Sequence, residues 1–244
     1  MKRYESLHFD VMQVAIDGPA SAGKSTVAKI VANKLSFVYI DTGAMYRACT
    51  FIARKHGLDY GDEAGILKAI DEDGIVLEPG ESGHKVLVAG EDVSLEIRTP
   101  EITANVSQVS ALPGVRSKMV DLQRKLAGST NVIMDGRDIG TTVLPEAEVK
   151  IFLVASARSR AERRLLDWQE KGIEAKQTVE EIEADIAKRD YLDSHREVSP
   201  LKKAADAIEI DSTNLTIDQV VAAILTEIAK KQIPASKFKK SLVK

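Results

Sequence analysis

The chain has 244 residues, a formal net charge of −3 and a hydrophobic content of 44%, which fits one large globular domain or one domain with an insert. This balance gives no general attraction to nucleic acid or to an anionic membrane, and no stretch reaches the roughly 18–20 apolar residues of a membrane span. The one cysteine, Cys49, excludes an intrachain disulfide, and the four histidines are scattered, so we expect a cytoplasmic protein without structural zinc.

The two ends of the chain are expected to be flexible tails. Residues 1–10 are mixed and charged and lack the apolar core of a signal peptide. Residues 233–244 are rich in lysine and follow the last helical pattern.

A glycine-rich loop follows the first apolar run, residues 11–16. Residues 18–25 read Gly-Pro-Ala-Ser-Ala-Gly-Lys-Ser, a complete phosphate loop, and apolar residues recur at helical spacing after it. Backbone N–H groups and the helix N-terminus attract a phosphate at such a loop. Lys24 is expected to reach the β- and γ-phosphates of a nucleotide, and the Ser25 hydroxyl to bind the accompanying Mg²⁺.

The second apolar run, residues 37–40, ends in Asp41-Thr42-Gly43-Ala44-Met45-Tyr46-Arg47. A hydroxyl and an arginine therefore stand at the carboxyl end of a core strand, where open α/β sheets bind ligands. Arg47 suits bidentate contact with a phosphate monoester, although taken alone it would read as a surface arginine on a helix.

Residues 68–98 break the alternation of strands and helices. Runs at 75–77 and 85–88, a turn at 80–83 and a third short strand at 90–92 predict an antiparallel β-meander, which we interpret as an insert. Helices are expected to resume with Pro100 and Pro113 at first helical positions.

The third core run, residues 132–134, leads into Asp135-Gly136-Arg137-Asp138. An aspartate at a strand tip downstream of a phosphate loop is the Walker-B pattern, so Asp135 is expected to hold Mg²⁺ directly or through water. Arg137 and Asp138 add a cation and a hydrogen-bond acceptor at the same edge.

Further core runs are predicted at 149–154 and 207–210, and capping boxes at Thr178 with Glu181 and at Thr216 with Gln219. Five strands that mostly precede helices predict a parallel sheet covered on both faces. Arginines in the first turns after 149–154 fit either a salt-bridged surface or a cationic lid over ATP. They are Arg158, Arg160, Arg163 and Arg164.

Arg189, Asp193 and Arg196 stand at positions i, i+4 and i+7, which predicts one shared helical face. An ion-paired surface and a substrate site explain this spacing equally well. The guanine motif of GTPases is absent, because residues 33–36 read Asn-Lys-Leu-Ser on the first helix, and the chain is too small for most motor ATPases. Polar groups outside the phosphate loop instead suit an enzyme with two phosphorylated substrates.

Residues 16–19, Ile-Asp-Gly-Pro, with the 41–47 string and segments 90–99, 104–109, 134–141 and 189–200, resemble the bacterial cytidylate kinase family from about residue 12 to about residue 230. The resemblance implies a three-layer α/β/α phosphate-loop fold with a five-stranded parallel sheet. It also implies a core at 11–67 and 99–232, a nucleoside-monophosphate-binding insert at 68–98 and a helical lid at about 156–196.

The resemblance further implies that a monomeric enzyme transfers the γ-phosphoryl group of ATP, carried with Mg²⁺, to CMP or dCMP in pyrimidine nucleotide metabolism. Nucleic acid and membranes are not expected partners. The implied ATP site consists of Gly18, Pro19, Ala20, Ser21, Ala22, Gly23, Lys24, Ser25 and Thr26. The implied acceptor site consists of Thr42, Arg47, Ser107, Arg116, Arg137, Asp138, Arg189, Asp193 and Arg196.

By the same resemblance, Thr42, Ser107, Arg116 and Asp138 contact the base, Arg189 and Asp193 hold the sugar, and Arg47, Arg137 and Arg196 clamp the acceptor phosphate. The implied catalytic cations are Lys24, Arg137 and Arg196 with the lid residues Arg160 and Arg164. The chain departs from the family at Ser21, where relatives often have Gly, at Thr42, where many have Ser, and at Val154, which is often polar.

Two alternatives stay open from the sequence. A phosphate-loop kinase for another acceptor, such as UMP, AMP or shikimate, would share the loop and the lid. A nucleotide-dependent regulator would share the loop but would show no turnover stimulated by an acceptor.

Overall fold

The structure is a computed structural model that describes residues 11–80, 83–128, 130–170 and 177–232. Its centre is a five-stranded sheet in the order β2-β6-β1-β7-β8, with every neighbouring pair parallel, as predicted. The expected tails at 1–10 and 233–244 lie outside the described residues. The strands are β1 (Gln13–Asp17), β2 (Val38–Asp41), β6 (Val132–Gly136), β7 (Val149–Val154) and β8 (Ile208–Asp211).

The register of the sheet collects the ends of its strands at one edge. Asp17 of β1 pairs with Gly136 of β6, and Asp41 of β2 pairs with Asp135 of β6. Several observed strands end one or two residues later than the predicted apolar runs. Backbone pairing continues through the aspartates at the ends of these strands, which the apolar pattern does not include. The phosphate loop, the start of the second helix and the loop after β6 therefore begin side by side.

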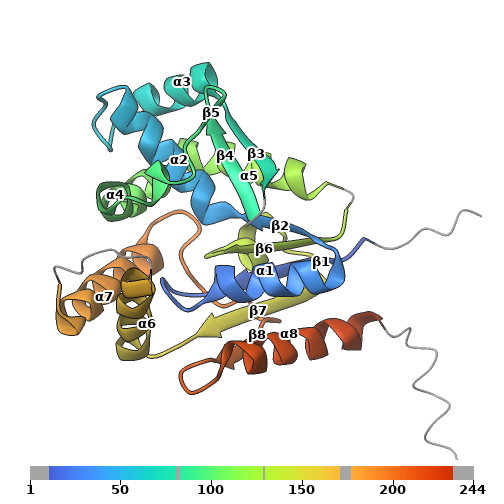
Figure 1. Cartoon of the computed structure of the whole chain (residues 1–244). Helices are drawn as coiled ribbons and strands as arrows, with labels where there is room; N and C mark the ends of the chain where they lie inside the picture. The colour runs from blue at the N-terminus through green and yellow to red at the C-terminus, as the bar shows by residue number, and fades with distance from the viewer. Residues whose placement is uncertain (1–10, 81–82, 129, 171–176, 233–244) are drawn as a thin grey trace, which may run out of the picture.

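Helices cover both faces of this sheet (Figure 1). On one face, α1 (Lys24–Leu35) and α8 (Ile217–Gln232) pack with Ile16 and Ile151 in one buried cluster. On the other, α2 (Thr42–Lys55) and α5 (Pro113–Ala127) pack with Ala15 and Met134. Cys49 of α2 is fully buried there, as a small core residue.

The insert forms the predicted antiparallel meander of β3 (Ile75–Gly80), β4 (Gly83–Val88) and β5 (Glu91–Asp92). Residues 81–82 of its predicted turn lie outside the described residues. The flanking helices are α3 (Glu63–Asp73), the short 3₁₀ turn η1 (Glu96–Arg98) and α4 (Pro100–Ala111). Val86, Val88 and Ile97 of this region belong to the same buried cluster as the sheet and α2, so the insert shares the core.

The helices α6 (Ala157–Glu170) and α7 (Val179–His195) pack on each other around Ala161, Ile182 and Ile186. The predicted capping box of Thr178 and Glu181 begins α7, and Thr216 and Gln219 exchange the same pair of hydrogen bonds before α8. None of the described helices combines the length and apolar content needed to cross a membrane.

The expectation of one helical face for Arg189, Asp193 and Arg196 is wrong in its last member. Helix α7 ends at His195, and Arg196 is extended, with φ −64° and ψ 146°. The chain turns back at this point, since the Leu201 N–H donates to the Asp193 carbonyl oxygen at 2.8 Å. Arg196 therefore reaches the other two from a loop, where its Nε donates to the Ser199 carbonyl oxygen at 2.7 Å.

Gly18 lies so close to β7 that a side chain at this position should destabilise the protein. We expect Gly18→Ala to lower the free energy of unfolding by roughly 2–5 kcal/mol, because its Cβ would lie 2.0 Å from the Leu153 carbonyl oxygen and its φ is +149°. Chemical denaturation measures the loss. Gly57→Ala is the matched control, because Gly57 has φ +64° but open space around it, and it should lose only roughly 1–2 kcal/mol. Equal losses in the two variants would contradict the steric argument.

Candidate active site

The phosphate loop joins β1 to α1 through backbone conformations that few side chains tolerate. Gly23 has φ 87°, and Ser21 has φ 59° although it carries a side chain. A glycine would adopt this conformation without strain. The Ser21 hydroxyl accepts hydrogen bonds from Arg164 Nε and Nη2 at 3.1 and 2.7 Å, which ties the loop to α6.

Lys24 is buried at the bottom of the loop, where its Nζ donates to the Pro19 carbonyl oxygen at 2.7 Å. Burial is the main cause that lowers the Lys24 pKa to about 7, and the nearby charge of Arg137 is the second cause. The charges of Asp135 and Asp17 oppose this shift. A bound phosphate would restore the charge of this ammonium group.

Ser25 and Asp135 form an oxygen-rich pair beside Lys24. The Ser25 hydroxyl donates to Asp135 Oδ2 at 2.9 Å, and the Tyr39 hydroxyl donates to Asp135 Oδ1 at 2.7 Å. Burial, and next the charge of Asp41, raise the Asp135 pKa to about 6, so a cation here would be stabilising. A hydroxyl and a carboxylate suit Mg²⁺, which takes few protein ligands and completes its shell with phosphate and water oxygens. Within the described ranges no three His, Cys, Asp or Glu residues gather as a metal site.

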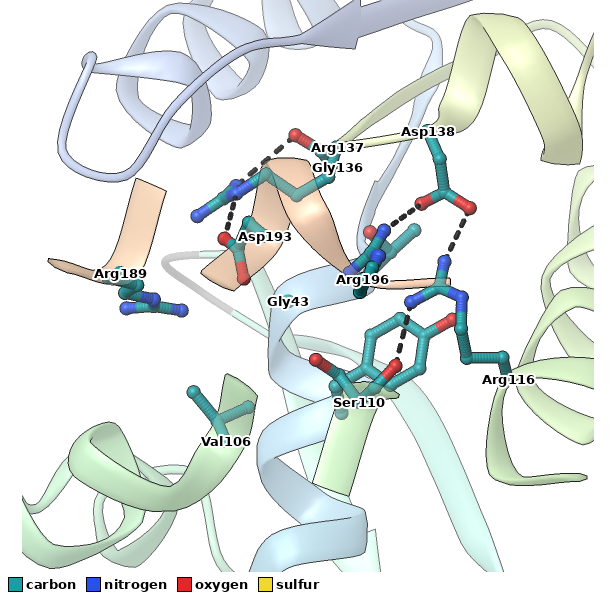
Figure 2. Close-up of a pocket in the computed structure, with 12 residues that line it drawn as sticks. Gly43, Val106, Ser110, Arg116, Gly136, Arg137, Asp138, Arg189, Asp193 and Arg196 are labelled. Carbon is teal, nitrogen blue, oxygen red and sulfur yellow. Dashed lines mark hydrogen bonds and ion pairs between the residues drawn. The ribbon is translucent and has the colours of Figure 1, made fainter. Parts of the chain in front are cut away.

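A second polar pocket opens next to the phosphate loop (Figure 2). It is partly open to solvent. The residues that line it come from α2, α4, α5, the loop after β6, and α7 with the residues that follow it. They are Thr42, Gly43, Tyr46, Val106, Ser110, Arg116, Gly136, Arg137, Asp138, Arg189, Asp193 and Arg196.

Seven of the nine predicted acceptor residues line this pocket: Thr42, Arg116, Arg137, Asp138, Arg189, Asp193 and Arg196. Ser107 reaches it indirectly, because its hydroxyl donates to Asp193 Oδ1 at 3.1 Å. Arg47 does not line it: its Nη1 donates to Thr103 Oγ1 at 2.6 Å and to the Ile97 carbonyl oxygen at 3.4 Å. The binding roles of all nine stay predictions.

Asp138 lies between two buried arginines on one wall of the pocket. Arg116 Nη2 donates to Asp138 Oδ2 at 2.5 Å, and Arg196 Nη2 lies 3.5 Å from Asp138 Oδ1. Arg116 is only 1% exposed, and its guanidinium stacks 5.1 Å from the centre of the Tyr46 ring. Because a buried charge needs a partner, Asp138 is fixed in place and stays an acceptor.

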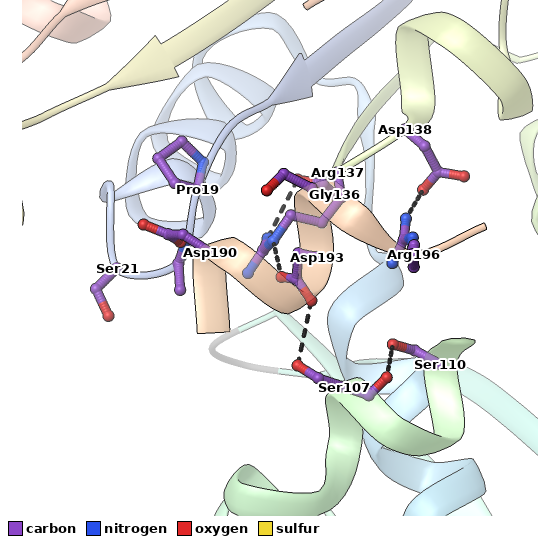
Figure 3. A network of polar contacts seen from close by, with 12 residues as sticks. Pro19, Ser21, Ser107, Ser110, Gly136, Arg137, Asp138, Asp190, Asp193 and Arg196 are labelled. Carbon is purple, nitrogen blue, oxygen red and sulfur yellow. Dashed lines mark hydrogen bonds and ion pairs between the residues drawn. The ribbon is translucent and has the colours of Figure 1, made fainter. Parts of the chain in front are cut away.

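Asp193 joins three elements across the opposite wall (Figure 3). Its Oδ2 accepts from Arg137 Nε at 3.0 Å, and its Oδ1 accepts from the Ser107 hydroxyl. Burial raises and the nearby Arg137 and Arg189 lower the Asp193 pKa, with a net shift below the usual value. The carboxylate therefore stays ionised and connects α7 to α4 and to the loop after β6.

Several polar atoms of the pocket walls are buried without a hydrogen bond. Those of lining residues include Tyr46 Oη, Arg116 Nε and Arg189 Nε. Buried donors without partners cost about 1–3 kcal/mol each, so their convergence on one pocket indicates a ligand that supplies acceptors.

Cations crowd the same region. Burial, and next Arg137, lower the Arg189 pKa to about 9, and burial with Arg98 lowers that of Arg47 to about 10. The pKa values of Arg164 and Arg196 are lowered as well, again chiefly by burial. Positive groups that depress one another's pKa favour an anion between them.

The arginines of α6 divide by their contacts. Arg160 is buried and donates to the Ala20 carbonyl oxygen at 2.9 Å and to Asp190 Oδ2 at 2.6 Å. Arg163 instead binds Ser212, and Arg158 is exposed in ion pairs with Glu162, Glu180 and Glu183. Of the two sequence interpretations, Arg158 follows the salt-bridged surface, whereas Arg160 and Arg164 contact the phosphate loop.

Comparison with known proteins decides the family. The family model described as cytidylate kinase matches residues 14–230. The chain belongs to the cytidylate kinase family. Curated relatives named cytidylate kinase include one from Lactobacillus gasseri, 67% identical over 91% of this chain and 96% of the relative. Another, from Carboxydothermus hydrogenoformans, is 52% identical over 90% of this chain and 98% of the relative. A shikimate kinase structure from Acinetobacter baumannii covers 92% of this chain and 96% of its own, at 16% identity and a TM-score of 0.44.

Four residues of the site escaped the sequence reasoning: Tyr39, Tyr46, Ser110 and Asp190. Tyr46 lies inside the 41–47 string, so that string could have singled it out. Asp190, whose Oδ1 accepts the Ala20 N–H at 3.1 Å, adjoins Arg189 in the sequence. Its target lies 170 residues away along the chain, and local spacing carries no signal for such a contact.

Lys24 makes the stability of the nucleotide-free protein depend on pH. The folded Lys24 pKa is about 7 against 10.5 for the free side chain, so above pH 7 the unfolded chain binds more protons and stability rises with pH. Lys24→Met lacks this dependence. We expect the free energy of unfolding of the wild type to rise relative to that of Lys24→Met between pH 6 and pH 8.5 in urea denaturation.

Lys34→Met, at an exposed position of the same helix, is the control and should keep the wild-type slope. Parallel pH profiles for the wild type and Lys24→Met would contradict the lowered pKa.

Proposed function

We propose that the protein transfers the γ-phosphoryl group of ATP to CMP or dCMP, with CDP or dCDP and ADP as products. The carrying observation is the pocket beside the phosphate loop, where crowded cations and unpartnered buried donors meet. Membership of the cytidylate kinase family supports a nucleoside monophosphate as the occupant. The proposed enzyme acts as a cytoplasmic monomer in pyrimidine nucleotide metabolism.

The donor half of the proposed site is the loop from Gly18 to Thr26. Its backbone N–H groups and Lys24 would hold the β- and γ-phosphates of ATP. Ser25 and Asp135, 2.9 Å apart, would hold Mg²⁺, with Asp135 binding it directly or through water. When bound, the ion neutralises charge on the two phosphates.

The acceptor half is the second pocket. Asp138 would accept a hydrogen bond from the N4 amino group of cytosine. Each carboxylate oxygen can accept more than one hydrogen bond, and Arg116 uses only part of this capacity. Uracil presents a carbonyl oxygen at that position and would meet the same carboxylate as a repulsive pair. Thr42, Ser107 and Arg116 complete the proposed base contacts.

Arg189 and Asp193 are the proposed sugar contacts, and Arg47, Arg137 and Arg196 the proposed phosphate contacts. For Arg47 this role requires that it leave Thr103 and turn toward the pocket. Arg137 stands between the halves, because it lines the pocket and also lowers the pKa of Lys24.

The transfer needs no covalent intermediate, because the acceptor phosphate oxygen is already nucleophilic. The protein contributes in-line positioning and neutralisation of the charge on the transferred group by Lys24, Arg137 and Arg196. The proposed lid arginines, Arg160 and Arg164, already contact the phosphate loop. They would exclude water and so limit hydrolysis of ATP.

An acceptor panel tests the function. With ATP and Mg²⁺, we expect CMP and dCMP to stimulate ADP release far more than UMP, AMP or shikimate. Lys24→Met should reduce this turnover by roughly 10²–10³-fold or more while the protein stays folded, because a preorganised cation is lost from the transition state. A coupled ADP-release assay and circular dichroism provide the two measurements.

Clear preference for UMP or AMP would replace the acceptor in the proposal with another monophosphate. ADP release that no acceptor stimulates would instead favour the nucleotide-dependent regulator.

Asp138→Asn tests the choice of base. The amide keeps the size of the side chain but presents an NH₂ group beside the base, so the ratio of kcat/KM for CMP to that for UMP should fall by roughly tenfold or more. Asn is preferable to Ala, because Ala would leave the buried Arg116 without its partner. Asp73→Asn, which removes an ion-paired carboxylate at the end of α3, is the control and should leave the ratio unchanged. An unchanged ratio in Asp138→Asn would remove Asp138 from the base site.

A further inference from the structure

Asp17, the last residue of β1, connects the phosphate loop to the loop that carries Arg137 and Asp138. Its Oδ1 accepts the Ile139 N–H at 2.8 Å, and its Oδ2 accepts the Gly140 N–H at 2.7 Å. The side chain is 5% exposed, so neither bond competes with bulk water.

Both ends of this contact belong to functional loops. Asp17 precedes Gly18, the first residue of the phosphate loop, in the chain. Ile139 and Gly140 begin the turn η2 (Ile139–Val143), directly after Arg137 and Asp138. One carboxylate thus joins the starting points of the proposed donor and acceptor halves.

Backbone pairing alone does not hold this loop. The register between β1 and β6 ends with Asp17 opposite Gly136, and the chain beyond Gly136 leaves the sheet. Asp138 has φ −142° and ψ 24°, which does not continue the strand. Beyond the ladder, the two bonds to Asp17 fix where the residues after Asp138 lie relative to β1.

The buried charge of Asp17 has a desolvation cost. Burial raises the Asp17 pKa to about 6, although both backbone N–H groups oppose this shift. A neutral side chain would avoid the desolvation. Only a carboxylate, however, offers two acceptor oxygens to two adjacent N–H groups.

We propose that Asp17 is a positioning residue that sets the acceptor-binding loop relative to the phosphate loop and touches neither substrate. This inference rests on the proposed function, because it assigns the loop at Arg137 and Asp138 to the acceptor nucleotide. Asp17 acts on the acceptor through these two residues, because its two hydrogen bonds go to Ile139 and Gly140 and not to the phosphate loop.

Asp17→Asn is the main test. The amide has one acceptor oxygen, so one of the two N–H groups faces an NH₂ donor and the loop shifts. We expect the KM for CMP to rise and kcat to fall, each by about tenfold, with the KM for ATP within about twofold of wild type. The preference for CMP over UMP should fall as well.

Gly140→Ala perturbs the same contact from the loop side. Its Cβ would lie 3.2 Å from Lys150 Cδ, which is tighter than usual packing, and in ordinary contact with Asp17 Oδ2 at 3.4 Å. The loop would therefore shift slightly while the carboxylate itself stays unchanged. A smaller rise in the KM for CMP, of about twofold to fivefold, is expected. The effects of Asp17→Asn and Gly140→Ala should not be additive in the double variant, because both act on one contact. If Asp17→Asn does not fold, the single variant Gly140→Ala tests the proposal.

Asp62→Asn is the matched control. Asp62 also accepts a backbone N–H, that of Gly65 at 3.0 Å, but it caps α3 outside the pocket. It should lose some stability and keep both KM values. Reduced stability of Asp17→Asn with both KM values and the CMP preference unchanged would overturn the proposal and leave Asp17 a structural residue.

The wild type separates the two levels of inference. Suppose that the wild type turns over CMP strongly, and that Asp17→Asn and Gly140→Ala both keep the wild-type KM for CMP and for ATP. This result would overturn the role of Asp17 alone. If another monophosphate is preferred, its KM is measured in place of the KM for CMP. A rise in this KM with an unchanged KM for ATP supports the role of Asp17, and no rise overturns it. Absence of any turnover stimulated by an acceptor would overturn the proposed function and the role of Asp17 with it.

Discussion

The parallel pairing of β1 with β6 is the constraint on which the site depends. It sets Asp17 beside Gly136, so two loops that are far apart in the sequence leave the sheet at neighbouring points. The pairing of β2 with β6 adds the start of α2 at the same edge. Ligands of open parallel sheets bind at such edges because the chain diverges there and leaves a crevice. The residues that line the pocket reach this crevice from the end of β6, from these loops and from the helices that cover it.

The crevice is organised around charges that oppose folding. Lys24, Arg189 and Arg47 all have lowered pKa values because burial and neighbouring cations disfavour their charged forms. Asp17 and Asp135 have raised values for the corresponding reason, with burial as the main cause. Local departures from the rules of stable folding are expected at functional sites. A polyphosphate ligand with a metal ion would supply the missing counter-charges, so its binding would stabilise the folded protein.

Most of the fold and half of the site could be predicted from the sequence, for identifiable reasons. The strands, the meander, the capping boxes and the pair Ser25 and Asp135 depend on local patterns or on chain order in a parallel sheet. Other features depend on tertiary geometry, which local patterns do not report. They are the contacts of Arg47, the loop position of Arg196 and the contact of Asp190 with the phosphate loop. Asp17 illustrates the limit, since its place before the phosphate loop is visible in the sequence but its two hydrogen bonds span 122 and 123 residues.

The division of the buried clusters has a consequence for how the molecule opens. The insert shares one continuous core with the sheet and α2, so we expect these elements to unfold as one cooperative unit. Helices α6 and α7 have a separate cluster with three fully buried residues, Ala161, Ile182 and Ile186. Regions with little buried apolar contact open at lower free energy than the rest. We therefore expect α6 and α7 to open locally at a lower free energy than the sheet.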